Sequence, residues 1–395
     1  MNLLLISIDS LRLDFVSRMG GRVSTPRFDA ATRNFGFYDR LFSVSSATRP
    51  VHSTLFTGLY PFEHGVLGQR SPLMRPRIPH LFDLFQSQGG RIGGFSEARD
   101  IFSGLTFADG FEPLNPTPAT GLRQLYSFLR EQPQQQNFLF LHYWSVHTPY
   151  GASDGQAFGE MGQLLANGQL SQVHGYYTRA VETLFEEKLA PLLSHLPLDQ
   201  WAIIIVSDHG ESWTNEEPYH GQTLRNSVLR VPLFYHIPLT GNPLLTAPLL
   251  SIIDLFPTLV SLFDLPLDYK GFGMDIRSEK KPEQYLAQIH PTLGNDDLAE
   301  ASPSVPVIGG NGPGRQWSLF DSLQKFTFDE DSKKGKLERT MSEEPLVVEG
   351  AREDYLQLWR KMRSRSSVSK MPFAKASRSQ EDLLDKRLRD LGYLD

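Results

Sequence analysis

Three long runs of apolar residues constrain the fold of this chain more than any other feature. They are Asn2–Ile8, Asn137–Trp144 and Trp201–Ser207. Each run has the length of a β-strand and is almost continuously apolar, which indicates that both of its faces are buried. Such strands are typical of parallel sheets that helices cover on both sides. The chain has 395 residues, which is enough for one large α/β domain and a smaller unit.

Residues with metal-binding chemistry follow two of these runs. Asp9 comes directly after the first run, and Asp208 and His209 come directly after the third. In open α/β sheets, ligands bind beyond the carboxyl ends of the strands. An aspartate and a histidine side by side at one strand end suit a divalent cation. Asp9 is either a further metal ligand or only a cap for the next helix.

His147 stands shortly after the second run, two residues before Pro149. A histidine just beyond the carboxyl end of a strand lies where a substrate would bind. Its side chain can exchange a proton near neutral pH, which suits work on a leaving group. An ordinary loop histidine would look the same in the sequence, so both interpretations stay open here.

The stretch from Ser43 to Gly65 contains a candidate nucleophile, Thr48. We expect a helix to begin there, because a threonine oxygen can cap a helix, Pro50 suits a first turn and Gly58 suits a left-handed end. The start of a helix offers free N–H groups and the positive end of a dipole, which favour a bound anion. Thr48 is therefore either a cap only or a nucleophile beside an anion site. We adopt the second interpretation as a hypothesis.

Composition and charge exclude several classes of protein. The net charge of -6 argues against a general nucleic-acid binder, because the phosphate backbone attracts basic surfaces. The chain has no cysteine, which excludes disulfides, thiolate metal sites, cysteine nucleophiles and any cofactor made from cysteine. The opening MNLLLISIDS lacks the basic flank of a signal peptide, and we find no apolar stretch of about 18 residues. We expect a cytoplasmic protein without a membrane span.

The pattern changes after about residue 271. Residues 302–313 are rich in proline and glycine, as a connection would be, and residues 316–348 contain short alternating runs that predict a small antiparallel sheet. Residues 363–375 are basic and serine-rich, which indicates a solvated segment or an interaction tail. Residues 381–391 predict a closing helix. We therefore predict a catalytic domain over residues 1–275 and a C-terminal subdomain over residues 276–395.

Short motifs in a fixed order cover most of the chain. They read ISIDSLR, TPRFD, TRPVHSTLFTG, YPFEHGV, VHTPY, VSDHGE, YHG before LRVPLF, SIIDLFPTL and RLRDLGYLD. Together they resemble the sulfatase branch of the alkaline phosphatase superfamily. The resemblance implies an α/β fold, alkaline-phosphatase-like, in which helices sandwich a mostly parallel sheet and a small C-terminal antiparallel sheet with a helix follows. It also implies a divalent metal that acidic residues hold at strand ends.

The resemblance assigns roles by position. Asp9, Asp208 and His209 match metal-binding residues of the family, and Thr48 falls where the family keeps its nucleophile. His147 and His220 match positions that face the substrate or the leaving group.

The motif around Thr48 departs from that of sulfatases. Sulfatases carry a cysteine or serine there, which is oxidised to formylglycine, and an arginine four residues later. This chain has Thr48 and His52 at these places, and Ser10 stands where sulfatases often have a second metal-binding aspartate. Threonine is not a known substrate for that oxidation, so we expect no formylglycine. The threonine is similar to the nucleophile of phosphodiesterases, phosphonate hydrolases and phosphoglycerol transferases of the superfamily.

The sequence therefore predicts a metal-dependent hydrolase or transferase that cleaves phosphate-type esters through a covalent Thr48 intermediate. These esters are phosphodiesters, phosphonates or phosphomonoesters, and the substrate is an anionic small molecule, a glycan or a lipid head group. We expect one divalent cation, Ca, Mg, Mn or Zn, bound by Asp9, Asp208, His209 and Thr48.

His147 or His220 would protonate the leaving oxygen, and His52 could contact the anionic oxygens of the substrate. Two alternatives stay open. The chain could be a sulfuric ester hydrolase, or a catalytically silent relative that serves in binding or scaffolding.

Overall fold

The computed structural model describes residues 1–69, 78–130, 136–150, 158–214, 218–238, 241–242, 245–290, 315–348 and 350–366. The predicted connection over residues 302–313 and the predicted closing helix over residues 381–391 lie outside these residues. Most of the predicted basic segment lies outside them too.

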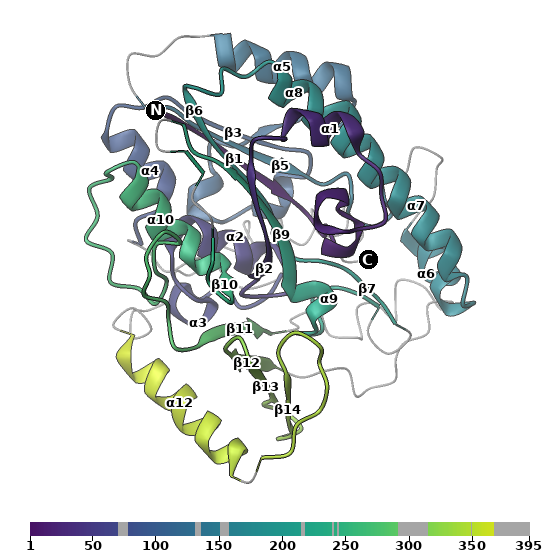
Figure 1. Ribbon diagram of the computed structural model, residues 1–395, viewed down its shortest axis with the longest axis vertical. Helices are drawn as coiled ribbons and strands as arrows, with labels where there is room; N and C mark the ends of the chain where they lie inside the picture. Colours follow the sequence, from purple (N-terminus) through teal and green to yellow (C-terminus); the bar gives the residue numbers. More distant parts are fainter. Residues whose placement is uncertain are drawn as a thin grey trace.

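A large central sheet organises the molecule (Figure 1). It has eight strands in the order β10-β2-β9-β6-β1-β5-β3-β4, and β1 lies between β5 and β6. All neighbouring pairs are parallel except those that β9 forms with β2 and β6. The three apolar runs of the sequence form the adjacent strands β5, β1 and β6. The strand bounds are β1 Asn2–Ile8, β2 Gly36–Phe42, β3 Ile92–Ser96, β4 Glu112–Pro113, β5 Phe138–Tyr143, β6 Trp201–Ser207, β9 Arg230–His236 and β10 Leu250–Ser251.

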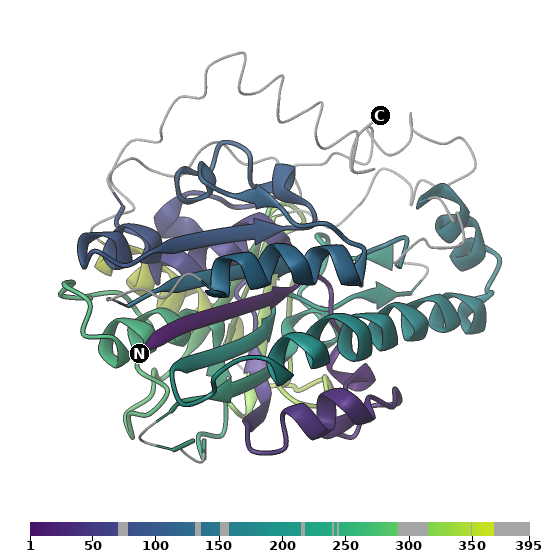
Figure 2. The same cartoon turned by 90° about the horizontal axis from the view of Figure 1, so that it is seen from above.

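Helices cover both faces of this sheet, as Figures 1 and 2 show. Strand β1 explains why, because Leu3 and Leu5 belong to one apolar core and Leu4 and Ile6 to the other. The first core includes side chains of α2 Thr48–Thr57, α4 Leu81–Ser87 and α10 Leu255–Leu262. The second includes those of α1 Pro26–Ala31, α5 Pro118–Arg130, α7 Leu170–Thr183, the π-helix Leu184–Leu189 and α8 Ala190–Ser194.

Shorter elements connect these layers. They are the helices α3 Pro61–His64, α6 Phe158–Ala166 and α9 Asn226–Leu229, the 3-10 turns η1 Leu13–Phe15, η2 Ser17–Met19, η3 Arg99–Phe102, η4 Thr106–Ala108 and η6 Ile252–Asp254, and a two-stranded ribbon of β7 Ser212–Trp213 and β8 Pro218–Tyr219. In the described part of the chain, we find no helix whose length and apolar character would let it cross a bilayer.

A second, antiparallel sheet follows near the C-terminus. Its four strands are β11 Tyr285–Ile289, β12 Gln316–Phe320, β13 Gln324–Asp329 and β14 Gly335–Arg339. Helix α12, Ala351–Arg365, packs on this sheet through Trp359, whose ring lies 5.4 Å from that of Trp317. The predicted fold class is confirmed. The domain boundary after residue 275 stays a prediction.

Candidate active site

Four buried side chains meet at the carboxyl edge of the central sheet. Asp9 follows β1, His142 lies near the end of β5, and Asp208 and His209 follow β6. Because β1 lies between β5 and β6, the register of these strands brings the residues to one place. Thr48 arrives from the start of α2, which packs on one face of the sheet.

Thr48 does not cap its helix, so this part of the sequence prediction was wrong. Ala47 is the N-cap, in an extended conformation, and Thr48 is the first residue of α2. The hydroxyl of Thr48 instead donates to Oδ2 of Asp9 at 3.1 Å and lies 3.3 Å from Nε2 of His209. The hydroxyl is therefore directed at two of the predicted metal ligands.

Ser10 orients both carboxylates of the site. Its backbone N–H donates to Oδ1 of Asp208 at 3.1 Å, and its hydroxyl donates to Oδ1 of Asp9 at 2.7 Å. Ser10 has a φ of 57°, a left-handed conformation that is uncommon for a residue with a side chain. Such strained positions cluster at functional sites. Ser10 supplies no carboxylate of its own but holds those of Asp9 and Asp208 in place.

The protonation states of the cluster fit a cation. Burial and the neighbouring Asp9 carboxylate raise the pKa of Asp208 well above its ordinary value. Burial also opposes the ionisation of Asp9, but the surrounding histidines, His142 first, hold the pKa of Asp9 well below its ordinary value. Two buried carboxylates this close cannot both ionise cheaply without a positive charge between them.

His209 has the tautomer that a metal ligand needs. Burial lowers its pKa to about 3, which keeps the imidazole neutral near pH 7. Its Nδ1 lies 2.9 Å from the carbonyl oxygen of Gly210, so Nδ1 carries the proton and donates it there. Nε2 then presents a lone pair toward Asp208, whose Oδ2 lies 3.5 Å away.

Asp9, Asp208 and His209 fit a divalent metal ion. One ligand atom from each of the three lies within 4.8 Å of the others. Oδ2 of Asp208 is buried and has no hydrogen-bond partner among the described residues, which is costly unless a ligand satisfies it. Oxygen and imidazole donors together suit Mg, Mn, Ca or Zn without selecting one of them.

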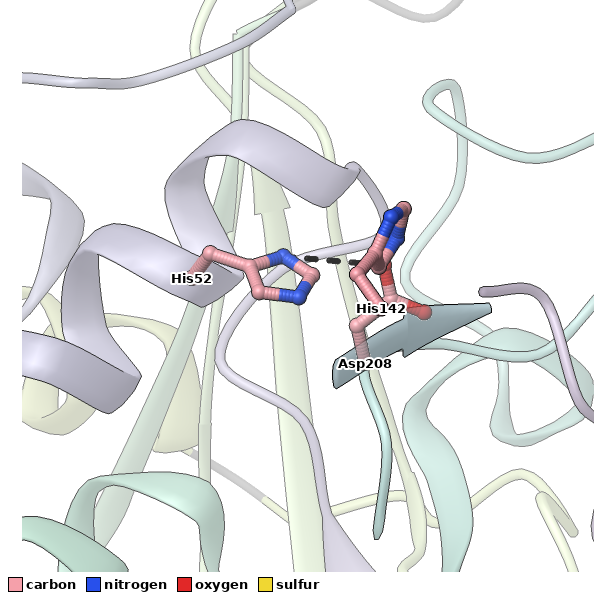
Figure 3. A group of neighbouring side chains, drawn as sticks. All are labelled: His52, His142 and Asp208. Carbon is pink, nitrogen blue, oxygen red and sulfur yellow. Dashed lines mark ion pairs between the residues drawn. The ribbon is translucent and has the colours of Figure 1, made fainter. Parts of the chain in front are cut away.

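A second cluster, His52, His142 and Asp208, fits a metal less well. Figure 3 shows the three side chains pointing toward one another, with Nδ1 of His52 3.9 Å from Oδ2 of Asp208. Nδ1 of His52 lies 2.8 Å from the carbonyl oxygen of Thr48, so it donates a proton there and cannot bind a metal. Its Nε2 lies 2.8 Å from the hydroxyl of Ser7.

The role predicted for His52 therefore needs a correction. Both of its ring nitrogens already have protein partners, and its ring packs 4.9 Å from that of Phe102. Burial lowers the pKa of His52 to about 3, so the ring carries no charge that would attract an anion near pH 7. His52 holds the start of α2 against β1 rather than contacting substrate.

Sequence reasoning missed His142. Its Nε2 lies 3.3 Å from Oδ2 of Asp9, and its Nδ1 lies 2.8 Å from the hydroxyl of Ser96. The signal was present, because His142 is an imidazole inside an otherwise apolar and aromatic run, Phe138–Tyr143. A buried strand does not accept such a group without a partner.

His147 and His220 lie together beside the metal ligand His209. Their rings are 4.8 Å apart, and the ring of His220 is 4.4 Å from that of His209. The ring of His147 stacks on Trp144 at 3.5 Å, and its Nδ1 lies 2.6 Å from the carbonyl oxygen of Thr148. Burial lowers the pKa of His147 to about 3. The structure thus brings both predicted histidines to the site.

Glu211 is a second residue that the sequence prediction left out. Its Oε1 lies 3.1 Å from Nδ1 of His220, and its Oε2 accepts from the hydroxyls of Thr148 at 3.2 Å and Tyr150 at 3.3 Å. Burial lowers the pKa of His220, but the Glu211 carboxylate more than offsets this, and the result is a raised pKa. His220 is therefore the better proton donor of the two histidines.

Comparisons with known proteins give one family. A sequence model of the family Sulfatase matches residues 1–265. No curated protein matches the chain. Among solved structures, a 2-O GAG sulfatase aligns with a TM-score of 0.70 at 13% identity over 96% of each chain. A phosphonate monoester hydrolase of Agrobacterium radiobacter aligns with a TM-score of 0.67 at 18% identity, over 92% of this chain and 96% of that one. The lipoteichoic acid synthase LtaP of Listeria monocytogenes aligns with a TM-score of 0.62 at 17% identity, over 95% of this chain and 93% of that one.

Proposed function

Since this chain belongs to the sulfatase family of ester hydrolases, we propose that it cleaves phosphate-type esters with Thr48 as nucleophile. One observation carries the proposal. The Thr48 hydroxyl contacts Asp9 and His209 within 3.3 Å, although it is free of any capping bond. A threonine whose role was only to stabilise the helix would be expected to accept a capping hydrogen bond from a free N–H of the first turn.

The arrangement suits in-line attack on a tetrahedral ester. Oγ1 of Thr48, which its hydrogen bond to Asp9 orients, attacks phosphorus and gives up the hydroxyl proton to water. His220, whose pKa the Glu211 carboxylate raises, protonates the leaving oxygen. Water or an acceptor alcohol then releases the group from Thr48.

A metal would be held by Asp9, Asp208 and His209, with Thr48 as a further ligand. When bound, a divalent cation supplies charge that lowers the pKa of a contacting hydroxyl and offsets negative charge on the ester oxygens. Oδ2 of Asp208, which has no partner among the described residues, is the ligand atom that the protein leaves open for it.

Threonine chemistry favours phosphorus over sulfur as the target. Formylglycine forms from cysteine or serine, and this chain has no cysteine and a threonine at the position. Phosphonate monoester hydrolases and a lipoteichoic acid synthase are among the structural neighbours, which supports a phosphate-type ester. The substrate would then be an anionic ester on a small molecule, a glycan or a lipid head group. A cytoplasmic location stays a prediction from the sequence.

A sulfate ester is the second candidate. It is favoured by the family match and by neighbours such as a 2-O GAG sulfatase and an enzyme solved with D-glucosamine-2-N,6-O-disulfate. In that case, the sulfuryl group would have to pass to a threonine oxygen. The two candidates differ in which ester is turned over, so paired substrates separate them.

The first prediction concerns Thr48. Thr48→Val keeps the shape of the side chain and removes the attacking oxygen, so kcat/KM should fall on the order of a thousandfold or more. Thr48→Ser is the matched control, and it should retain turnover because it keeps the hydroxyl. The measurement is kcat/KM on 4-nitrophenyl esters of phosphate, a phosphodiester, phenylphosphonate and sulfate.

Several outcomes decide between the candidates. Preferred turnover of the sulfate ester would replace our proposal with the second candidate. Near-normal activity of Thr48→Val on the best ester would exclude Thr48 as nucleophile. A folded, metal-loaded protein without turnover of any ester would favour the silent relative.

A further inference from the structure

Arg49 carries a fully buried guanidinium beside the proposed nucleophile. It is the second residue of α2 and has no exposed surface. Its Nη1 donates to the carbonyl oxygens of Ile101 at 2.8 Å and Ser103 at 2.9 Å. These two bonds fix the plane of the guanidinium.

The positive charge of Arg49 has no counter-ion among the residues that the structure describes. Burial alone lowers its pKa to about 10, and no carboxylate of the described residues forms an ion pair with it. Buried charges in proteins are normally paired, since removing an ion from water costs several kcal/mol. An unpaired buried arginine therefore either binds an anionic ligand or destabilises the fold without serving a function.

The unused edge of the guanidinium has the right geometry. Nε and Nη2 of Arg49 are buried and have no hydrogen-bond partner in the part of the chain that the structure describes. The N–H bonds of these two atoms point the same way and form the fork that binds carboxylate, sulfate or phosphate through two parallel hydrogen bonds. Nη1, the remaining nitrogen, holds the fork in place.

Other donors without partners among the described residues lie near Arg49, either along the chain or through a contact with it. Oε1 of Gln69 accepts from the backbone N–H of Arg49 at 3.3 Å, while Nε2 of Gln69 has no hydrogen-bond partner in the described part of the chain. The hydroxyls of Ser45 and Ser46 are also buried and unpartnered among the described residues. A surplus of buried donors indicates that the missing acceptor is a ligand.

The fork and the reacting group occupy different places. Consecutive residues of a helix point about 100° apart, so Arg49 cannot follow the Thr48 hydroxyl toward Asp9 and His209. Arg49 reaches η3 instead, where the ring of Phe102 packs on His52 and His142 at 4.9 and 5.0 Å. The fork therefore lies on the β3 side of the metal ligands.

We propose that the Nε and Nη2 edge of Arg49 binds a second anionic group of the substrate, next to the ester that Thr48 attacks. The substrate class is thus an ester that carries an additional carboxylate, sulfate or phosphate. This inference rests on the proposed function, because it takes the ester to react at Thr48.

Inert phosphonates test the inference by binding alone. Each pair consists of a carboxyphenylphosphonate and the carbamoylphenylphosphonate of the same shape, with the substituent at ring position 3 or 4. Calorimetric titration of the protein as purified gives the Kd of each. For at least one position, the wild type should bind the carboxylate on the order of ten- to hundredfold more tightly.

Variants of Arg49 test whether its Nε and Nη2 edge causes the preference for the carboxylate over the amide. Arg49→Met should abolish it, and Arg49→Lys should retain only a part, because lysine keeps the charge but loses the two parallel donors. Arg99→Met is the matched control, since Arg99 is a partly exposed arginine of η3, and it should keep the full preference.

Three results would overturn the inference. Equal affinity of the wild type for both members of each pair would show that there is no second anion subsite, while the proposed function would stand. A full preference in Arg49→Lys and Arg49→Met would place the subsite elsewhere. Failure of all four phosphonates to bind would instead refute the anion site at Thr48, and this inference with it.

Discussion

Asp208 is costly to bury in the metal-free protein and well suited to bind a metal. Burial and the nearby Asp9 disfavour its charge, yet its Oδ2 is left without a partner among the described residues. Both features make sense if a cation completes the site. The protein then gives up stability in its metal-free state in order to bind the metal tightly.

Asp208→Asn should separate these effects. The metal content by elemental analysis should fall to background, and turnover should be lost, because an amide is a weaker ligand than a carboxylate. The metal-free variant should nevertheless unfold at a higher temperature than metal-free wild type near pH 7, because folding opposes the ionisation of Asp208 and the amide of the variant does not ionise.

The control for this variant is Asp199→Asn, which changes an exposed aspartate. It should alter neither metal content nor unfolding temperature. Retention of stoichiometric metal by Asp208→Asn would contradict the assignment of Asp208 as a ligand.

At the scale of helices and strands, a buried ion pair holds the loop after β5 in place. Oε1 of Glu97 pairs with Nζ of Lys188 at 2.5 Å, and its Oε2 accepts from the backbone N–H groups of Trp144 and Ser145. Lys188 belongs to the π-helix Leu184–Leu189, and such bulges occur frequently at functional sites. Because Trp144 stacks on His147, this pair fixes the position of the histidine.

Lys188→Met should therefore lower both stability and kcat. It leaves the Glu97 carboxylate buried without its cation, which costs about 3–5 kcal/mol in comparable cases. The double variant Lys188→Met with Glu97→Gln should recover much of the unfolding free energy, since neither charge remains. Denaturant unfolding and kcat/KM measure the two effects. A single variant as stable as wild type would show that the pair does not brace the loop.

At the scale of the whole molecule, Asp254 joins the two sheets. It lies at the end of η6, just before α10, and its Oδ2 accepts from the hydroxyl of Tyr285 on β11 at 2.7 Å. Its Oδ1 accepts from the backbone N–H of Met274 at 2.8 Å. Burial raises the pKa of Asp254 to about 6. The protonated form is thus favoured in the folded state.

Asp254→Asn should change how stability depends on pH. Because the folded-state pKa is raised, the stability that Asp254 contributes is fully present below the ordinary pKa of 3.8 and is lost as the pH rises through about 6. The difference amounts to about 3 kcal/mol at most. The unfolding free energy of the variant should vary less than that of wild type between pH 4 and 7, measured by urea unfolding. Parallel curves would refute this linkage.

The strand-end residues could be predicted from sequence, but the contacts that their supporting residues make could not. Asp9, Asp208 and His209 directly follow buried strands, so the rule for open sheets places them without coordinates. His142 and Glu211 reach the site through the register of strands and loops that are distant in the sequence. Ser10 stands next to Asp9, but its contact with Asp208 joins two distant strand ends. The small antiparallel sheet was predicted over residues 316–348, which contain β12, β13 and β14, but β11 lies before this range and was missed.

Ala47 occupies the N-cap position of α2. The side chain of residue 48 is therefore not needed to start the helix and is available for the reaction. A threonine, serine or cysteine could stand at position 48 on the same backbone without altering how the helix begins. Natural variation could then exchange the attacking atom by single-codon steps while the scaffold stays intact. Proteins with this fold could then acquire different reactions by changing the residue at this one position, with little loss of stability.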